Sequence, residues 1–194
     1  YNPDAGKLEQ LPISFPVEDF QSSIHGVIYD AVKNPADGAI YMVPWKAHPH
    51  LVRFRPEEGA VGKIEDLGRL SQPGNPYLPM SVNLCHVGGL VFGNDGMLYY
   101  VKSVWHGGPR AISNKMTKET IAYLCRMDPV SLEHEEICTL NGGAGSNHYI
   151  SRGAKDAEGN FYFGKILAKP AGIYRVAVNE KQTQTNNDFL RYWG

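Results

Sequence analysis

The sequence predicts an all-β protein, a β-propeller with four-stranded antiparallel blades, and three observations support this fold class. Glycine and proline are frequent, at 21 and 13 residues, and aromatic residues make up 11% of the 194-residue chain. Long stretches with helical periodicity are missing, which favours short strands joined by turns. A unit consisting of a tight turn and an apolar strand also occurs three times along the chain.

The repeated turn is centred on Gly38, Gly96 and Gly159, which are separated by 58 and 63 residues. Asp37, Asp95 and Glu158 precede these glycines, and an apolar strand follows each of them. Because glycine accepts positive φ without steric cost, an Asp-Gly pair between two strands indicates a β-hairpin. Each turn therefore predicts a hairpin at the same place in a repeated unit.

Two further strands follow each of these hairpins, so that each unit contains four strands. The expected strands are 26–30, 39–43, 51–55 and 63–67 in the first unit, 88–92, 97–101, 121–127 and 135–140 in the second, and 149–154, 160–163, 173–176 and 189–193 in the third. Residues 117–126 are the best helical candidate, but Ile121, Tyr123 and Cys125 alternate as they would in a strand. Four strands joined by hairpins are typical of a propeller blade.

The chain is predicted to be part of a single propeller domain, with blades at about 20–70, 82–141 and 146–194. Residues 1–12 resemble the end of one further blade. Propellers have about four to eight blades, so three blades leave the ring incomplete. We expect the missing blades to precede Tyr1, and assembly of several copies of the chain is the alternative. A β-sandwich is the competing fold, but it does not explain the recurring turn and strand.

Composition narrows the range of partners. The formal net charge is -1, and charged residues make up 20% of the chain, so a nucleic-acid partner is not expected. No apolar run approaches the roughly 20 residues of a membrane helix, and no membrane partner is expected. The cysteines, Cys85, Cys125 and Cys138, form no CxxC pair, which favours buried free thiols.

A histidine stands at the start of the first strand of every unit: His25, His86 and His148. In a propeller these strands line the central channel, so the three side chains are expected to approach one axis. Histidine can exchange a proton near neutral pH, and a cluster of neutral histidines can hold a divalent metal ion. The three positions together predict a binding or catalytic face, although any one of these histidines alone is more typical of a satisfied polar group at a strand end.

The ends of the second strands reach the same face and add basic and aromatic groups. Lys46, Trp105, His106 and Lys165 lie there, and Asn147, Tyr149 and Arg152 come from the neighbouring loop and strand. An exposed tryptophan such as Trp105 can stack on a sugar ring. The expected substrate-binding residues are Arg152, Trp105, His148, Asn147, His25 and Lys46.

Residues 80–170 resemble the propeller-fold polysaccharide lyases that degrade ulvan. Those enzymes carry two histidines in one blade, matched here by His86 and His106, and a tyrosine with a basic residue in the next blade, matched by Tyr149 and Lys165. The family's usual basic residue is arginine, so Lys165 departs from the pattern, and Arg152 can supply that role instead. The resemblance implies an acidic polysaccharide partner and an exported protein, secreted or periplasmic.

The chemistry implied is β-elimination from a uronic acid. A cation must neutralise the carboxylate before the neighbouring proton can be removed, and Lys165 or Arg152 suits this role, with His86 assisting. A base takes the proton and an acid protonates the departing oxygen, and His106 and Tyr149 are the candidates for these two roles in either order.

Two other classes of function remain open at this stage. One is a non-catalytic propeller that binds a glycan or a protein on the same face, since the fold supports many unrelated functions. The other is a metal-dependent sugar lactonase, which needs carboxylate or amide ligands near the axis, where Asn83 and Asn147 are the candidates. A hydrolytic glycosidase is disfavoured, because the acidic residues are concentrated in the hairpins on the far side of the blades.

Overall fold

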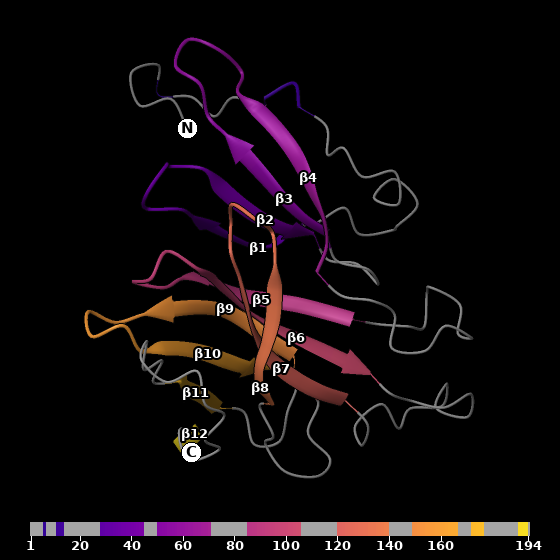
Figure 1. The fold of residues 1–194 in the computed structure, drawn as a ribbon, viewed down its shortest axis with the longest axis vertical. Coiled ribbons are helices and arrows are strands. Elements are labelled where there is room, and N and C mark those ends of the chain that lie inside the picture. Colours follow the sequence, from indigo (N-terminus) through magenta and orange to yellow (C-terminus); the bar gives the residue numbers. More distant parts are fainter. Residues whose placement is uncertain are drawn as a thin grey trace.

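A computed structural model shows an all-β fold whose strands form three antiparallel sheets (Figure 1). It describes residues 6, 11–13, 28–44, 50–70, 85–105, 120–139, 149–166, 172–176 and 190–193. These residues include twelve strands and no helix. The predicted all-β class is therefore confirmed, while the predicted blade end at 1–12 falls mostly outside the described residues.

Each sheet has four strands that pair in the order in which they occur along the chain. The first sheet contains β1 (Ile28–Lys33), β2 (Ile40–Pro44), β3 (His50–Arg55) and β4 (Lys63–Arg69). The second contains β5 (Cys85–Phe92), β6 (Leu98–Trp105), β7 (Thr120–Met127) and β8 (His134–Thr139). The third contains β9 (Tyr149–Lys155), β10 (Phe161–Ile166), β11 (Gly172–Val176) and β12 (Leu190–Trp193). Residues 120–126 of the segment with both helical and strand character thus lie in strand β7.

The hairpin between the first and second strand turns at an equivalent glycine in all three sheets, and the loop of the first hairpin is one residue longer than the other two. Gly38, Gly96 and Gly159 adopt φ values of 73°, 79° and 87°, which only glycine adopts readily. One backbone hydrogen bond closes each hairpin, from Asn34 N to Ala39 O at 2.7 Å, from Gly93 N to Met97 O at 2.9 Å and from Asp156 N to Asn160 O at 3.1 Å. The repeat predicted from the turn glycines is therefore present in the backbone.

The sheets are stacked one after another, with the second between the first and the third (Figure 1). Because side chains alternate between the faces of a strand, positions two and three after each turn glycine face opposite ways. Leu98 packs in the core shared with the first sheet, whereas Tyr99 packs in the core shared with the third. Each internal sheet face is thus covered by an adjacent sheet, and the two apolar cores hold the stack together.

A tyrosine and an arginine form a cross-strand pair in every sheet, on the face that points toward the next sheet. The paired positions are Tyr41 and Arg53, Tyr99 and Arg126, and Tyr162 and Arg175. A glutamate continues the row in the first two sheets, where Arg53 pairs with Glu65 and Arg126 with Glu135. The recurrence of these pairs at one register position is independent support for a repeated unit.

Glu65 shows the electrostatic role of this row. Its carboxylate contacts Arg53 and Arg55 at 2.9 Å and Lys63 at 3.0 Å. Hydrogen bonds from Lys63 and Arg53 lower the pKa of Glu65 to about 2. The carboxylate is therefore ionised under all ordinary conditions and connects strands β3 and β4.

Candidate functional site

The backbone brings part of the predicted site to one end of the second and third sheets. His86 is the second residue of β5 and Trp105 the last of β6, whereas Tyr149 begins β9 and Lys165 is the penultimate residue of β10. His86 pairs with Ser103, and Tyr149 pairs with Ile166. The side chains of these four residues, and His25, Lys46, His106, Asn147 and His148 entirely, lie outside the described part of the structure.

The first strands of the three sheets, β1, β5 and β9, meet in the middle of the molecule, where β5 packs against both others. Each of them contains an irregularity in its pairing with the second strand. The segments Ile28–Asp30, Gly88–Val91 and Ile150–Gly153 each hold one residue more than the strand opposite. Such bulges change the direction of side chains and are frequent beside active sites, so this inner region is the candidate site.

Asp30 is a buried carboxylate in this region and is only 5% exposed. It accepts hydrogen bonds from Leu90 N in β5 at 2.8 Å and from its own neighbour Ala31 N at 2.9 Å. Burial raises the pKa of Asp30 above its ordinary value, although backbone hydrogen bonds and the charge of Arg152 act in the opposite direction. Asp30 therefore connects two inner strands through a titratable group held in a poorly solvated place.

Close backbone contact joins β5 to β9. Gly89 in the β5 bulge adopts a φ of 69°, and its carbonyl oxygen would lie 2.8 Å from a Cβ added at Gly153. The same added Cβ would lie 2.3 Å from Val91 Cγ2. Glycine at position 153 is thus required for the observed spacing, which fixes Tyr149 and Arg152 relative to β5.

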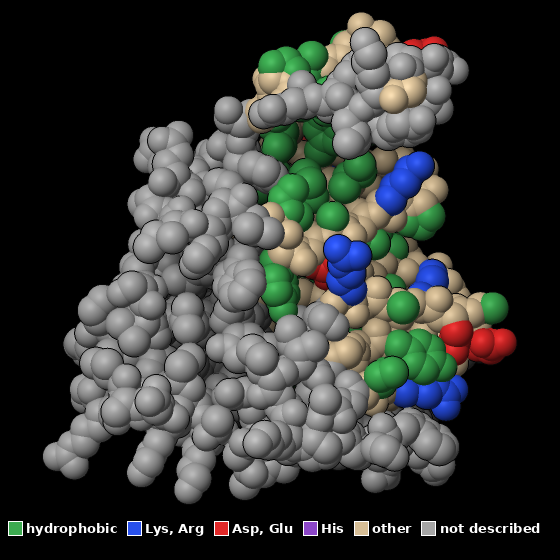
Figure 2. All heavy atoms as spheres, turned by 180° about the vertical axis from the view of Figure 1, so that it is seen from behind, with side chains coloured by type: hydrophobic (Ala, Val, Ile, Leu, Met, Phe, Trp, Pro, Cys, Tyr) green, Lys and Arg blue, Asp and Glu red, His purple; other side chains and the backbone are tan. Residues whose placement is uncertain are grey.

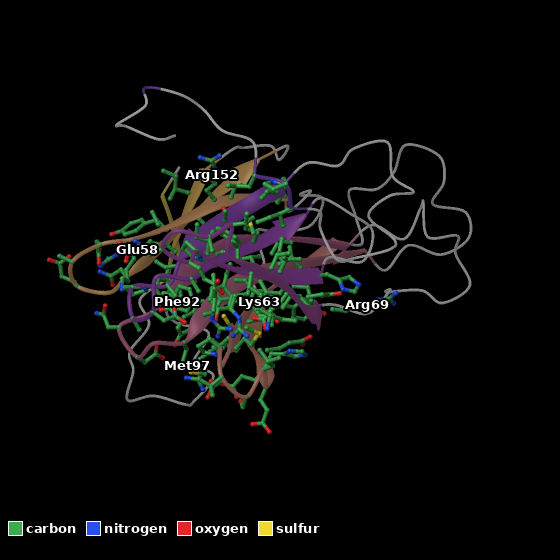
Figure 3. All side chains as sticks on the ribbon, turned by 90° about the horizontal axis from the view of Figure 1, so that it is seen from above. Glu58, Lys63, Arg69, Phe92, Met97 and Arg152 are labelled. Atoms are coloured by element: carbon green, nitrogen blue, oxygen red, sulfur yellow. The ribbon has the colours of Figure 1, made fainter. Side chains whose placement is uncertain are left out.

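Arg152 is the one residue of the predicted site whose side chain the structure describes. It is exposed, lies three residues after Tyr149 on β9, and extends away from the packed interior in Figure 3. Basic side chains on the described part of the face in Figure 2 are isolated from one another, with hydrophobic side chains between them. Arg152 therefore offers an accessible cation on strand β9, suited to one anionic group of a ligand.

The predicted divalent metal remains a prediction. Within the residues that the structure describes, no three His, Cys, Asp or Glu side chains form a group that could hold a metal ion. The predicted histidine cluster, His25, His86 and His148, lies outside the described side chains.

The described part of the chain also contains no helix of a length and apolarity that would cross a membrane.

The sequence analysis missed Asp30. The sequence signal for Asp30 was a single carboxylate among mostly apolar neighbours at residues 28–32. The equivalent strands of the other two units contain no acidic residue. The prediction that the cysteines are buried is confirmed for Cys125, whereas Cys138 is only half-buried and the side chain of Cys85 lies outside the described part of the structure.

No protein-family model matches this chain, and no curated protein matches its sequence. The functional conclusion therefore depends on the residues and geometry of the inner strands.

Proposed function

We propose that the chain is part of a β-propeller polysaccharide lyase that cleaves a uronic-acid-containing polysaccharide by β-elimination. The observation that carries this proposal is the common position of His86 and Tyr149, each at the start of an inner strand, with Trp105 and Lys165 at the ends of the adjoining strands. Strands β5 and β9 pack directly against each other, which supports a common site formed from these two strands.

The propeller itself is proposed on the repetition of the sheets. Three sheets with the same strand order, an equivalent turn glycine and a bulge in the first strand stack through equivalent faces. Successive blades of a propeller are related in this way. In such a fold the starting ends of β1, β5 and β9 open on one face of the ring.

The proposed reaction proceeds without a change in oxidation state. A base, His106 or Tyr149, takes the proton from the carbon beside the carboxylate, and the electron pair forms a carbon–carbon double bond. The bond from the next ring carbon to the glycosidic oxygen breaks, and the other residue of this pair protonates that oxygen. Proton removal is favourable only when a cation neutralises the carboxylate, because negative charge accumulates there.

Arg152 is a better-supported candidate than Lys165 for the cation that neutralises the carboxylate. Its guanidinium is exposed, and it lies on the same strand as Tyr149 and three residues beyond it. A guanidinium can also bind a carboxylate through two parallel hydrogen bonds, which orients the sugar as well as neutralising it.

The test is an ultraviolet assay for the unsaturated product, using a panel of uronic-acid polysaccharides with the wild-type chain and variants. We expect His106→Ala and Tyr149→Phe each to remove most turnover, and Arg152→Ala to reduce it by at least tenfold. Lys155→Ala is the matched control, because Lys155 is a cation on the same strand whose side chain bonds Asn94 at 2.7 Å, at the hairpin end. Arg152→Lys should recover part of the activity lost in Arg152→Ala.

Two results would overturn the lyase proposal. One is turnover close to that of the wild type in both His106→Ala and Tyr149→Phe. The other is the absence of product with every polymer from a folded sample that still binds one of them, which would instead support a non-catalytic glycan-binding propeller.

A further inference from the structure

Three residues stand at equivalent positions in the bulges of the inner strands: Asp30 in β1, Gly89 in β5 and Arg152 in β9. Each lies four positions before the residue whose backbone N–H closes the hairpin to the second strand. Strand β5 packs against both β1 and β9. The repeated unit therefore places an acidic and a basic residue on either side of a strand that carries a glycine at the same position.

The carboxylate of Asp30 bonds to the bulge of β5. Its Oδ2 accepts a hydrogen bond from Leu90 N at 2.8 Å, and a backbone hydrogen bond from Gly89 also acts on it. Its Oδ1 accepts a hydrogen bond from Ala31 N at 2.9 Å within its own strand. The residue is only 5% exposed, so water competes little for these bonds. Asp30 thus restrains the part of β5 where Gly89 adopts its positive φ of 69°.

The other side of this bulge contacts β9 directly beside Arg152. The carbonyl oxygen of Gly89 would lie 2.8 Å from a Cβ added at Gly153, the residue that follows Arg152. Gly89 is therefore held by Asp30 through its backbone N–H and lies against β9 through its carbonyl group. Because this approach leaves no room for a side chain at Gly153, a shift of the β5 bulge would also shift the backbone that carries Arg152.

A charge interaction forms a second link between Asp30 and Arg152. Burial raises the pKa of Asp30, backbone hydrogen bonds lower it, and the charge of Arg152 lowers it as well. Strand β2 contains no charged residue, the titratable residues at the start of β5 are Cys85 and His86, and Lys155 lies at the hairpin end of β9. Because a charge interaction is mutual, the ionised carboxylate of Asp30 also attracts the guanidinium of Arg152.

We propose that Asp30 is a positioning residue for Arg152, fixing through the β5 bulge and through its charge where the guanidinium meets an anionic ligand. The proposal rests on the proposed function in one respect, the role of Arg152 as the cation that binds the substrate carboxylate. An arginine that is already held in place loses less rotamer freedom on binding than a freely moving one. Asp30 itself is buried and acts only through Arg152.

The test is a pH titration of the full chain followed by NMR, which observes the backbone amide of Leu90 and the Nε–Hε group of Arg152. In the wild type both resonances should shift with the same midpoint, because both groups respond to the ionisation of Asp30. In Asp30→Asn both shifts should be lost. Asp128→Asn is the matched control, because Asp128 is a carboxylate that accepts the amide of Val130 at 2.7 Å in the β7–β8 hairpin, and it should leave both shifts unchanged.

The ultraviolet lyase assay provides a second measurement. Asp30→Ala removes the charge and the bonds to β5, so kcat/KM should fall by about fivefold or more, while Asp128→Ala should leave kcat/KM unchanged. Circular dichroism checks that both variants are folded. The Nε–Hε resonance of Arg152 is identified by its loss in Arg152→Lys.

The two measurements separate this proposal from the lyase assignment. A Leu90 shift without a matching Arg152 shift, or an Arg152 shift that persists in Asp30→Asn, would overturn the positioning role even in an active lyase. An unchanged kcat/KM in folded Asp30→Ala would do the same. Matched shifts in a chain that cleaves no polymer would support the link between Asp30 and Arg152 and would count against the proposed lyase function alone.

Discussion

At the scale of single residues, Asp30 is the most unusual feature of the inner strands. It is a carboxylate at 5% exposure, and the groups that act on it are the backbone amides of Ala31, Gly89 and Leu90 and the more distant charge of Arg152. Desolvation outweighs these stabilising contacts, because the pKa of Asp30 is raised. The carboxyl group is thus retained at a cost to stability, which is typical of residues that serve a site.

Asp30→Asn separates the charge of this side chain from its hydrogen bonds. Because the folded pKa lies above the unfolded value near 3.8, the stability contributed by Asp30 is complete below that pH. It is lost as the pH rises through the folded pKa, whereas asparagine does not titrate. We expect Asp30→Asn to gain stability relative to the wild type as the pH rises from about 3.8 through the folded pKa of Asp30, measured by urea unfolding.

Asp30→Ala provides the comparison, since it removes the acceptor and leaves the amide of Leu90 without its partner at 2.8 Å. It should lower the free energy of unfolding by about 1–3 kcal/mol across this pH range. A stability difference between Asp30→Asn and the wild type that does not change with pH would contradict the account.

At the scale of elements, the spacing between β5 and β9 depends on one glycine. An added methyl group at Gly153 would meet Val91 Cγ2 at 2.3 Å and Gly89 O at 2.8 Å. We expect Gly153→Ala to lower the free energy of unfolding by about 1–3 kcal/mol, because two packed strands must separate. The cost should be smaller in a Val91→Ala background, which removes the nearer atom, and equal costs in both backgrounds would contradict this contact.

Most strands and turns could be predicted from the sequence, because the signals that define them lie close together along the chain. An Asp-Gly pair fixes a hairpin within a few residues, so the turns at Gly38 and Gly96 and the strands beside them follow from short-range chemistry. The bulges in β1, β5 and β9 could not be predicted in this way, because an extra residue is defined only relative to the strand opposite.

At the scale of the whole molecule, a shared face for His86, Tyr149 and Arg152 could be predicted from the sequence only because these residues lie at similar places in a repeated unit. The buried position of Asp30 depends on β5, 60 residues farther along the chain, so neither its burial nor its bond to Leu90 has a local signal. The same limit applies to the packed faces of the sheets, because their burial depends on which neighbouring sheet covers them.

The stack also predicts how stability is distributed in the molecule. The second sheet is covered on both faces, and Leu98, Tyr99, Tyr100 and Val101 in β6 are all at most 1% exposed, whereas β4 has no fully buried residue within its bounds. In a stack whose sheets contact only their neighbours, the ends open more readily than the middle. Hydrogen exchange followed by mass spectrometry on the folded chain should therefore show the slowest exchange in β6 and β7. Exchange in β4 should be at least tenfold faster, and equal protection of β4 and β6 would mean instead that the three sheets open only together.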